Sequence, residues 1–335
     1  MDGKVVLITG GTGSFGKQCV RMILERYAVQ KLIILSRDEL KQFEMQQMFP
    51  AAQNERLRYF IGDVRDKDRL YRAFSGVDIV IHAAAMKQVP AAEYNPFEAV
   101  KTNIIGAQNV IDAAIDQNVK KVVALSTDKA ANPVNLYGAT KLCSDKIFIA
   151  GNAYTGRKVK TIFSVVRYGN VIGSRGSVIP FFLEKRSSGV LPITDLRMTR
   201  FWITLDQAVN FVFQCLSKMV GGELFVPKLP SMAIADLACA ICADCRHEII
   251  GIRPGEKLHE VMIPEDVSRL AVEFGDYYVI QPDFSFFNKG QMPMDGFRGP
   301  VPEGFEYSSA TNPHFLTVEQ MRTLIQPLIK GLNAQ

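Results

Sequence analysis

The 335-residue chain is predicted to adopt an α/β fold, in which a doubly wound parallel sheet is joined to a smaller domain. The first observation behind this prediction is that short apolar runs alternate with helix-like segments through the first half. The second is that a glycine-rich turn follows the first apolar run. Alternating strands and helices build a parallel sheet covered by helices on both faces. Strands are expected at residues 4–9, 31–36, 57–61, 78–83, 121–126 and 161–167, and helices near 15–26, 39–48, 67–74, 97–117 and 137–152.

The glycine-rich turn comes directly after the first expected strand, and a helix is expected to follow it. Gly10, Gly13 and Gly16 form a G-x-x-G-x-x-G pattern. Glycines at these positions allow a tight turn, close approach of the backbone to a pyrophosphate, and close packing of the helix. Because the strand and the helix flank the motif as required, it predicts a dinucleotide site. The residues expected to bind are Gly10, Thr12, Gly13, Ser14, Phe15 and Gly16.

The second half of the chain lacks this regular alternation. Residues 178–189 and 231–245 are expected to be amphipathic helices, and a helix at 205–219 is expected to return to the first domain. Residues 275–313 are rich in proline, glycine and aromatic residues without a clear period, which predicts irregular structure packed on the body. Thr317 and Gln320 have the spacing of a capping box, which predicts the start of a last helix.

These elements suggest two domains. The expected division is 1–170 with 201–228 for the dinucleotide-binding Rossmann domain, and 171–200 with 229–335 for the smaller domain and a C-terminal extension.

The end of the second expected strand bears on the choice of cofactor. NAD-selective folds place an acidic residue about 20 residues past the glycines to bind the ribose hydroxyls. Here the strand ends in Ser36-Arg37. Serine does not repel a 2′-phosphate, and the adjacent guanidinium can bind one. The pair favours NADP over NAD, although Asp38 and Glu39 follow directly and argue the other way.

Tyr137 and Lys141 are four residues apart, so they share one face of the expected helix. A free tyrosine titrates near ~10, so acting as a base near pH ~7 requires its pKa to fall by about 3 units, or roughly 4 kcal/mol. A close ammonium and an oxidised nicotinamide can together supply that shift. This spacing is weak by itself, but it gains weight from the stretch before it.

Thr127, Asp128 and Lys129 follow the apolar strand 121–126 and begin a loop at its carboxyl end. Catalytic groups of open α/β sheets lie at that end. We therefore expect all three residues to share a site with Tyr137. The alternative is an ordinary surface ion pair in a loop.

Together these features resemble the extended short-chain dehydrogenase/reductase superfamily, over about residues 4–270. Thr-Asp-Lys at 127–129, where many relatives carry Thr-Asp-Glu, resembles the UDP-N-acetylglucosamine 4,6-dehydratases that invert C5. The resemblance implies a first step of pseudaminic acid or related surface-sugar synthesis, and a homo-oligomer, with a hexamer expected. Further stretches that agree with this family are Ala83–Pro90, Arg167–Gly173, Met198–Thr204 and Arg253–Glu260.

The resemblance also implies roles for individual residues. Asp63 is expected near the adenine, with a loop cap as the alternative, and Thr127 is expected to orient the substrate. Further cofactor contacts are expected from Val64, Ala83, Ala84, Lys87, Tyr137 and Lys141. Sugar-nucleotide contacts are expected from Lys87, Asn170, Arg200, Arg253 and Glu256, for which a solvated charge or polar group is the alternative.

The chemistry implied by the resemblance has three steps. Tyr137 removes the proton of the sugar 4-hydroxyl as C4 loses hydride to the nicotinamide, water then leaves from C6, and the hydride returns to C6. Asp128 can be the acid at C6 if its pKa is raised. Lys129 can be the base at C5 only if it is partly neutral. Which group returns the C5 proton on the opposite face stays open.

Two other functions are compatible with parts of the sequence. A UDP-sugar 4-epimerase shares the fold, but it needs no acid or base at C6 and C5, so Asp128 and Lys129 argue against it. A non-enzymatic NADP sensor could dispense with the tyrosine–lysine pair, which is present here.

Composition narrows the partners. The net charge of +5 is spread without a block of like charges, which disfavours a nucleic-acid partner. No apolar run reaches ~18 residues, so no membrane span is expected. The first strand is expected at residue 4, leaving no room for a signal peptide, and the six cysteines are expected in a reducing cytoplasm.

Cys239, Cys242 and Cys245, with His247 nearby, have spacing that suggests an iron–sulfur site. We expect no metal there, because a continuous apolar helix would splay the thiols. His82 is expected to be structural, and His259 and His314 carry no signal.

Overall fold

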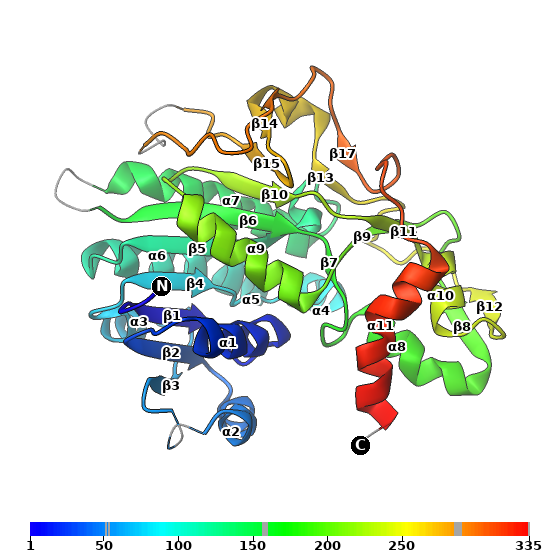
Figure 1. Cartoon of the computed structure of the whole chain (residues 1–335), viewed down its shortest axis with the longest axis horizontal. Coiled ribbons are helices and arrows are strands. Elements are labelled where there is room, and N and C mark those ends of the chain that lie inside the picture. The colour runs from blue at the N-terminus through cyan, green and yellow to red at the C-terminus, as the bar shows by residue number, and fades with distance from the viewer. Residues whose placement is uncertain (51, 53, 156–159, 285–289, 334–335) are drawn as a thin grey trace.

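The structure, a computed structural model, describes residues 1–50, 52, 54–155, 160–284 and 290–333. Its centre is a ten-stranded sheet in the order β16-β14-β15-β10-β6-β5-β4-β1-β2-β3 (Figure 1). The run from β3 to β6 is parallel and has the 3-2-1-4-5-6 order of a Rossmann sheet, which confirms the predicted fold class. The parallel strands are β1 (Val5–Thr9), β2 (Lys31–Ser36), β3 (Leu57–Ile61), β4 (Ile79–His82), β5 (Lys121–Thr127), β6 (Ile162–Tyr168) and β10 (Leu224–Pro227).

Helices cover both faces of this sheet (Figure 1). One face carries α1 (Ser14–Arg26) and α9 (Leu205–Lys218), which contact each other although they lie far apart in sequence. The other face carries α3 (Lys67–Phe74), α6 (Gly106–Asp116) and α7 (Leu136–Tyr154), while α2 (Glu39–Met48) lies beside β3 at the edge. The prediction that 205–219 forms a helix returning to the first domain is confirmed.

The segment expected as one helix at 97–117 is divided. Pro96 begins α5 (Pro96–Val100), a π-helical turn occupies Lys101–Ile105, and α6 follows; α4 (Val89–Tyr94), which was not predicted, precedes them. The π turn places Asn103 where its amide donates to the Met86 carbonyl at 3.0 Å and its oxygen accepts from the Met86 N–H at 2.8 Å. The interruption therefore fastens the loop after β4, as such turns often do near functional sites.

The predicted irregular region 275–313 contains strands, so that prediction is wrong in part; residues 285–289 lie outside the described residues. β14 (Ala271–Glu273) and β15 (Tyr277–Ile280) extend the main sheet in antiparallel fashion, and β16 (Gly299–Pro300) pairs with β14. β17 (Tyr307–Ser308) pairs with β13 (Val261–Ile263). These strands are two to four residues long, so only their distant partners define them.

The predicted helix 231–245 is also shorter than expected. Residues Ser231–Ala233 form β11, because they pair with β9 (Thr199–Ile203), and α10 spans only Ile234–Ile241. The helix at 178–189 becomes α8 (Val178–Lys185) and a short 3₁₀ turn. The predicted capping box is confirmed at the start of α11 (Val318–Asn333), where Gln320 N–H donates to Thr317 Oγ1 at 3.2 Å and Thr317 N–H donates to Gln320 Oε1 at 2.8 Å. The remaining strands are β7 (Asn170–Val171), β8 (Val190–Ile193) and β12 (Arg246–Ile249).

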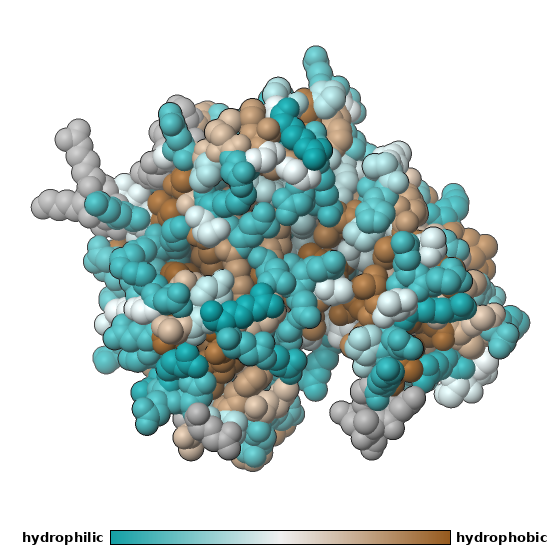
Figure 2. Space-filling model, in the orientation of Figure 1, coloured by the Kyte–Doolittle hydropathy of each residue, from teal (hydrophilic) through white to brown (hydrophobic). Residues whose placement is uncertain are grey.

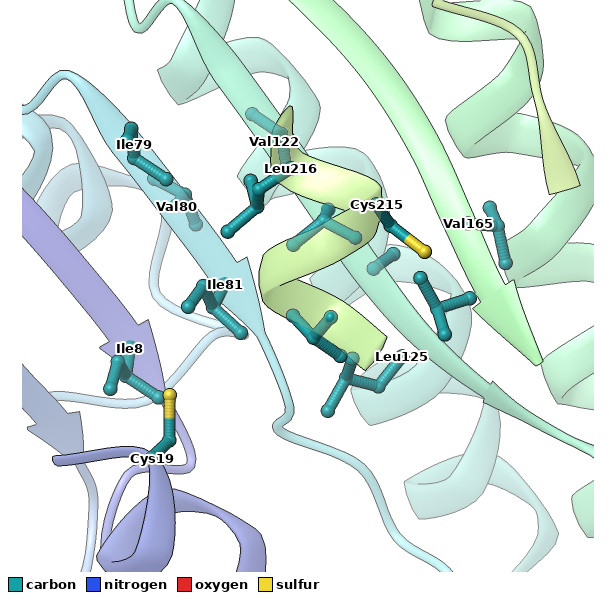
Figure 3. Close-up of a cluster of buried hydrophobic side chains, with 14 of the residues drawn as sticks. Ile8, Cys19, Ile79, Val80, Ile81, Val122, Leu125, Val165, Cys215 and Leu216 are labelled. Atoms are coloured by element: carbon teal, nitrogen blue, oxygen red, sulfur yellow. The ribbon is translucent and has the colours of Figure 1, made fainter. Parts of the chain in front are cut away.

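Besides a small cluster that contains Ala92, Ala99 and Tyr137, two large hydrophobic clusters lie in the described part of the chain. The larger one surrounds the main sheet, and Figure 3 shows α9 lying across β4, β5 and β6 with Cys215 and Leu216 directed to the strands. The smaller one joins α8, β8, α10 and α11. The elements around the smaller cluster form the smaller part of the molecule. Figure 2 shows an indentation at the lower edge of the view, between this part and the part built on the main sheet. Residues such as Met262, Tyr277, Val279 and Tyr307 belong to the larger cluster, whereas the sequence analysis placed 229–335 with the smaller domain.

Candidate active site

A cleft of about 1080 Å³ lies at the carboxyl ends of the parallel strands and continues to the smaller part of the molecule. It is lined by all the predicted site residues except Asp128, which is fully buried behind its wall. Ligands of doubly wound sheets bind at this edge, beside the point where the strand order reverses. Here that point lies between β1 and β4.

The glycine turn forms one end of the cleft. Gly10 has φ +64°, and a Cβ there would lie 2.8 Å from Ala84 Cα. A Cβ on Gly16 would lie 2.2 Å from the Gly11 carbonyl oxygen, so only glycine lets α1 pack this closely on the turn. The first turn of α1 contains no acidic side chain. The helix N-terminus is therefore suited to a pyrophosphate.

The neighbouring wall comes from the ends of β2 and β3. Thr12 Oγ1 and Ser36 Oγ are hydrogen-bonded at 2.8 Å. The Arg37 side chain is 62% exposed at the cleft edge, and its Nη1 lies 3.7 Å from Asp63 Oδ2. Burial alone would raise the pKa of Asp63, but hydrogen bonds from Arg65 and the charge of Arg37 lower it. Asp63 therefore stands ionised between two guanidinium groups.

The catalytic residues are held by two backbone turns in contact. After β5 the chain forms a 3₁₀ turn at Asp128–Ala130, in which the Lys129 N–H donates to Thr127 Oγ1 at 3.3 Å. α7 begins after Asn135, whose side chain accepts from the Gly138 N–H at 2.7 Å. A Cβ on Gly138 would lie 2.2 Å from the Lys129 carbonyl oxygen. This close contact brings the start of α7, and with it Tyr137, beside the end of β5.

Tyr137 is buried, and burial raises its pKa to about 12. The positive charge of Lys129 and a hydrogen bond with Thr127 act in the opposite direction. The Lys141 ammonium donates to the Leu125 carbonyl at 2.8 Å. Burial lowers the pKa of Lys141, and the charge of Asp145 opposes that change. A Tyr137 pKa low enough for base catalysis stays a prediction for the cofactor-bound site.

The pKa of Asp128 is raised, which is the condition for Asp128 to act as a general acid. Its side chain is fully buried, and burial and the charge of Glu260 raise its pKa, against the opposing effect of Lys129. Its Oδ1 accepts hydrogen bonds from Thr127 Oγ1 and Lys129 Nζ, both at 3.0 Å. Its Oδ2 is buried without a partner among the described residues.

The neighbours of Lys129 favour its charged form. Its Nζ lies 3.0 Å from Asp128 Oδ1, 3.3 Å from Asn170 Oδ1 and 3.3 Å from Glu260 Oε1. Burial would lower the pKa of Lys129, but the charges of Asp128 and Glu260 outweigh burial and raise it. The condition that Lys129 be partly neutral is therefore opposed by a second carboxylate beside it, and the role of Lys129 as the base stays a prediction.

That second carboxylate, Glu260, was missed as a site residue. It closes the Arg253–Glu260 stretch already noted in the sequence, and it lines the cleft while almost fully buried. Arg200 Nε lies 3.8 Å from its Oε1, and Lys257 Nζ lies 3.5 Å from its Oε2. Local sequence could not reveal this role, because only Lys257 is near Glu260 in sequence, whereas Lys129 and Arg200 come from distant segments.

The expected substrate residues differ in how free they are. Arg200 is buried, and its guanidinium donates to the carbonyls of Thr199 at 2.7 Å and Leu258 at 3.0 Å. Most of the N–H donors of this guanidinium are therefore already bonded to backbone carbonyls. Arg253 is half exposed in the cleft, with Nε 3.9 Å from Glu256 Oε1. Lys87 donates to the Arg175 carbonyl at 3.2 Å, and burial, with the charge of Lys129, lowers its pKa.

The histidine and cysteine residues give no metal site in the described part of the chain. His82 is buried against Thr9 Oγ1 at 2.8 Å, and burial together with Lys141 lowers its pKa to about 3, consistent with a structural role. Cys242 and Cys245 form a disulfide, which the sequence did not predict. The reason is that α10 ends at Ile241, so these two thiols are not splayed along a helix. Cys239 Sγ lies 4.0 Å from His247 Nε2.

The sequence matches a family described as polysaccharide biosynthesis proteins over residues 6–282. A Campylobacter jejuni protein named UDP-N-acetylglucosamine 4,6-dehydratase (inverting) is 57% identical over 328 residues, which cover 96% of this chain and 97% of that protein. A Rickettsia canadensis UDP-glucose 4-epimerase is 42% identical over 301 residues, covering 88% of this chain and 87% of that protein.

Solved structures agree on the fold. Pen from Bacillus thuringiensis has a TM-score of 0.88 and 38% identity, covering 98% of each chain. DesIV, a dTDP-glucose 4,6-dehydratase from Streptomyces venezuelae solved with NAD, has a TM-score of 0.67 and 24% identity, covering 77% of this chain and 87% of that one, and supports the fold alone.

The fold and the cleft define a dinucleotide-binding α/β protein of the extended short-chain dehydrogenase/reductase type. The chain belongs to the polysaccharide biosynthesis family that includes the inverting UDP-N-acetylglucosamine 4,6-dehydratases. None of its described helices is long and apolar enough to cross a membrane.

Proposed function

We propose that this chain removes water from UDP-N-acetylglucosamine between C5 and C6, with inversion at C5, using NADP. The observation that carries the proposal is the Asp128–Lys129 ion pair, in which Asp128 is buried and Lys129 is partly exposed to the cleft, beside Tyr137 at the end of β5. An acid and a base at this position serve an elimination. The name of the Campylobacter jejuni relative supports the same reaction.

The residues of the chain divide the work. When bound, NADP would accept the hydride from C4 of the sugar and later return it to C6. Tyr137 takes the proton of the 4-hydroxyl, with Thr127 as its hydrogen-bond partner. Asp128 gives a proton to the leaving 6-hydroxyl, since its raised pKa lets it hold one. Lys129 receives the proton from C5, which the 4-ketone has made acidic.

The residues present fit the cofactor. The turn at Gly10, Gly13 and Gly16 leaves room for a pyrophosphate where any Cβ on Gly10 or Gly16 would collide with backbone. Ser36 and Arg37 support NADP, because neither repels a 2′-phosphate and the guanidinium is exposed at the cleft edge. Asp38 competes less than the sequence suggested, since its carboxylate caps α2 and pairs with Lys41 at 2.9 Å.

The sugar nucleotide is proposed to lie between the nicotinamide end of the cleft and the smaller part of the molecule, with Arg253, Lys87 and Asn170 as its contacts. Arg200 then acts mainly through Glu260, because its own donors are directed to backbone carbonyls. A cytoplasmic homo-oligomer that feeds surface-sugar synthesis, such as that of pseudaminic acid, is part of the same proposal.

A second function has some support, because the Rickettsia canadensis relative is named as an epimerase. One experiment separates the two. The purified protein is incubated with UDP-N-acetylglucosamine and NADP, and the sugar nucleotides are separated by chromatography, which resolves epimers, before their masses are measured. A loss of about 18 mass units, expected for release of one water, supports the dehydratase. An isobaric product supports the epimerase, and an unchanged substrate contradicts both.

A further inference from the structure

We propose that Glu260 is a positioning residue for the elimination step. It holds Lys129 against Asp128. It also helps this pair retain the proton that is later transferred to the departing 6-hydroxyl. The inference rests on the proposed function and extends it to a residue that touches neither the reacting carbons nor the cofactor.

The geometry gives Lys129 one arrangement. Its three ammonium protons face three oxygens, on Asp128 at 3.0 Å, on Asn170 at 3.3 Å and on Glu260 at 3.3 Å. A lysine side chain otherwise carries about 2 kcal/mol of rotamer entropy. The contact with Glu260 and the contact with Asp128 together fix the amine at the cleft wall.

Glu260 is itself held in place. The Glu260 N–H donates to Ser309 Oγ at 2.9 Å, and the Glu260 carbonyl accepts from the Ser309 N–H at 2.8 Å. Burial would raise the pKa of Glu260, but Lys129, Arg200 and Lys257 outweigh burial and lower it. Glu260 is therefore an anion, and its position is set by backbone rather than by the lysine alone.

The cluster contains the protons that the elimination needs. The Asp128–Lys129 pair holds one shared proton, which resides on Lys129 before the reaction because the pKa of Lys129 is raised. When that proton moves 3.0 Å along the hydrogen bond to Asp128 Oδ1, the pair becomes a carboxylic acid beside a neutral amine. The acid and the base of the elimination are thereby created together.

The step then balances. The Asp128 O–H bond breaks and its proton joins the 6-hydroxyl, which leaves as water with the electrons of the C6–O bond. The C5–H bond breaks, its proton goes to Lys129 Nζ, and its electrons form the C5–C6 double bond. The pair returns to carboxylate and ammonium, so no further reagent is consumed.

Glu260 keeps the shared proton from being lost to solvent. The charged groups facing it are Lys129, Arg200 and Lys257, with Asp128 across the cluster. Its negative charge raises the pKa of both Asp128 and Lys129. Replacing it with a neutral group lowers both pKa values. The pair then loses its shared proton at a lower pH than in the wild type, and the rate of elimination falls at that lower pH.

The test measures the pH profile of elimination in Glu260→Gln, which keeps the shape and removes the charge. We expect the alkaline limb of kcat to move to lower pH by about 1–3 units, the usual effect of a close charge. Glu260→Asp, which keeps the charge, should leave the limb near its wild-type position. Glu273→Gln is the matched control, because Glu273 also pairs with two cations, Lys228 and Arg298, on β14 away from the cleft.

A double-mutant cycle separates positioning from structure. In a Lys129→Ala background, Glu260→Gln should slow elimination by a clearly smaller factor than in the wild type, since only its effect on Asp128 remains. Equal slowing in both backgrounds, or an unshifted limb in Glu260→Gln, would overturn the inference.

Thermal unfolding and NADP binding establish that each variant is folded. Should Glu260→Gln not fold, the same comparison is made with Glu260→Gln/Lys257→Met, in which a cation is removed with the anion. A wild-type protein that forms no dehydrated product contradicts the proposed function itself. An active wild type with an unshifted variant contradicts only the role of Glu260.

Discussion

The two ends of the cleft are built in different ways. The dinucleotide end consists of backbone, at a glycine turn and strand ends that follow one another within the first part of the chain. The other end consists of charged side chains, in which Lys129, Arg200 and Glu260 come from three distant segments. At the first end the main constraint is space, and at the second it is charge.

Because of this difference, the two ends of the cleft should tolerate different substitutions. A backbone cradle fails when an atom is added, because packing leaves no room. A charge cluster fails when an atom is removed, because a buried ion is left without its partner. The predictions below test this contrast, beginning with the largest expected effect.

Tyr137→Phe should reduce turnover by at least about 10⁴-fold, the upper range for losing one acid–base group. The ring remains for packing, so substrate binding should stay nearly intact. Turnover and the substrate dissociation constant are measured together. If this variant still reduces the nicotinamide with the sugar at the wild-type rate, Tyr137 is not the base.

Lys129→Ala should slow elimination by about 10²–10⁴-fold but still pass hydride from C4 to the cofactor. Incorporation of solvent deuterium at C5 should fall with it, and a 4-keto sugar that keeps its 6-hydroxyl should accumulate. NMR of the products reports both. In the wild type the product should have the inverted C5 configuration. Retention there would contradict an inverting enzyme, and unchanged turnover in the variant would show that Lys129 is a bystander.

Gly16→Ala should lower the free energy of unfolding by about 1–3 kcal/mol, the usual cost of overpacking. The added Cβ would lie 2.2 Å from the Gly11 carbonyl oxygen, so α1 must move away from the cofactor turn. Denaturant unfolding and NADP titration measure the two effects. Gly275→Ala is the control, since a Cβ there meets nothing within 4 Å. Equal effects at both positions would remove the packing argument.

Arg37→Ala should weaken NADP binding by about tenfold, or roughly 1.4 kcal/mol, while NAD binding changes little. The lost contact is the one between the guanidinium and the 2′-phosphate. Arg197→Ala, at an exposed arginine paired with Asp195, serves as the control. Equal NADP dissociation constants in wild type and Arg37→Ala would contradict the cofactor assignment.

The contrast between the two ends also explains what the sequence could predict. Strand–helix alternation and the glycine spacing are local signals, and the parallel sheet follows from them. β15 was missed because it pairs with β10, which lies far from it in sequence, and β14 because it pairs with β15 and β16. Asp128 and Lys129 were recognisable beside a strand end, whereas Glu260 could be placed only once the chain was folded. The charge state of Lys129 depends on that unpredicted neighbour, so the sequence could state only the condition that the lysine be partly neutral.

One contact described above bears on how such enzymes diversify. Gly138 packs against the carbonyl oxygen of Lys129, and not against its side chain. The frame that aligns Tyr137 with the end of β5 is therefore indifferent to which side chain position 129 carries. A glutamate can occupy the same backbone, as in the Thr-Asp-Glu pattern of related sequences. A substitution at position 129 should therefore alter the chemistry of that side chain while Tyr137 keeps its place beside the end of β5.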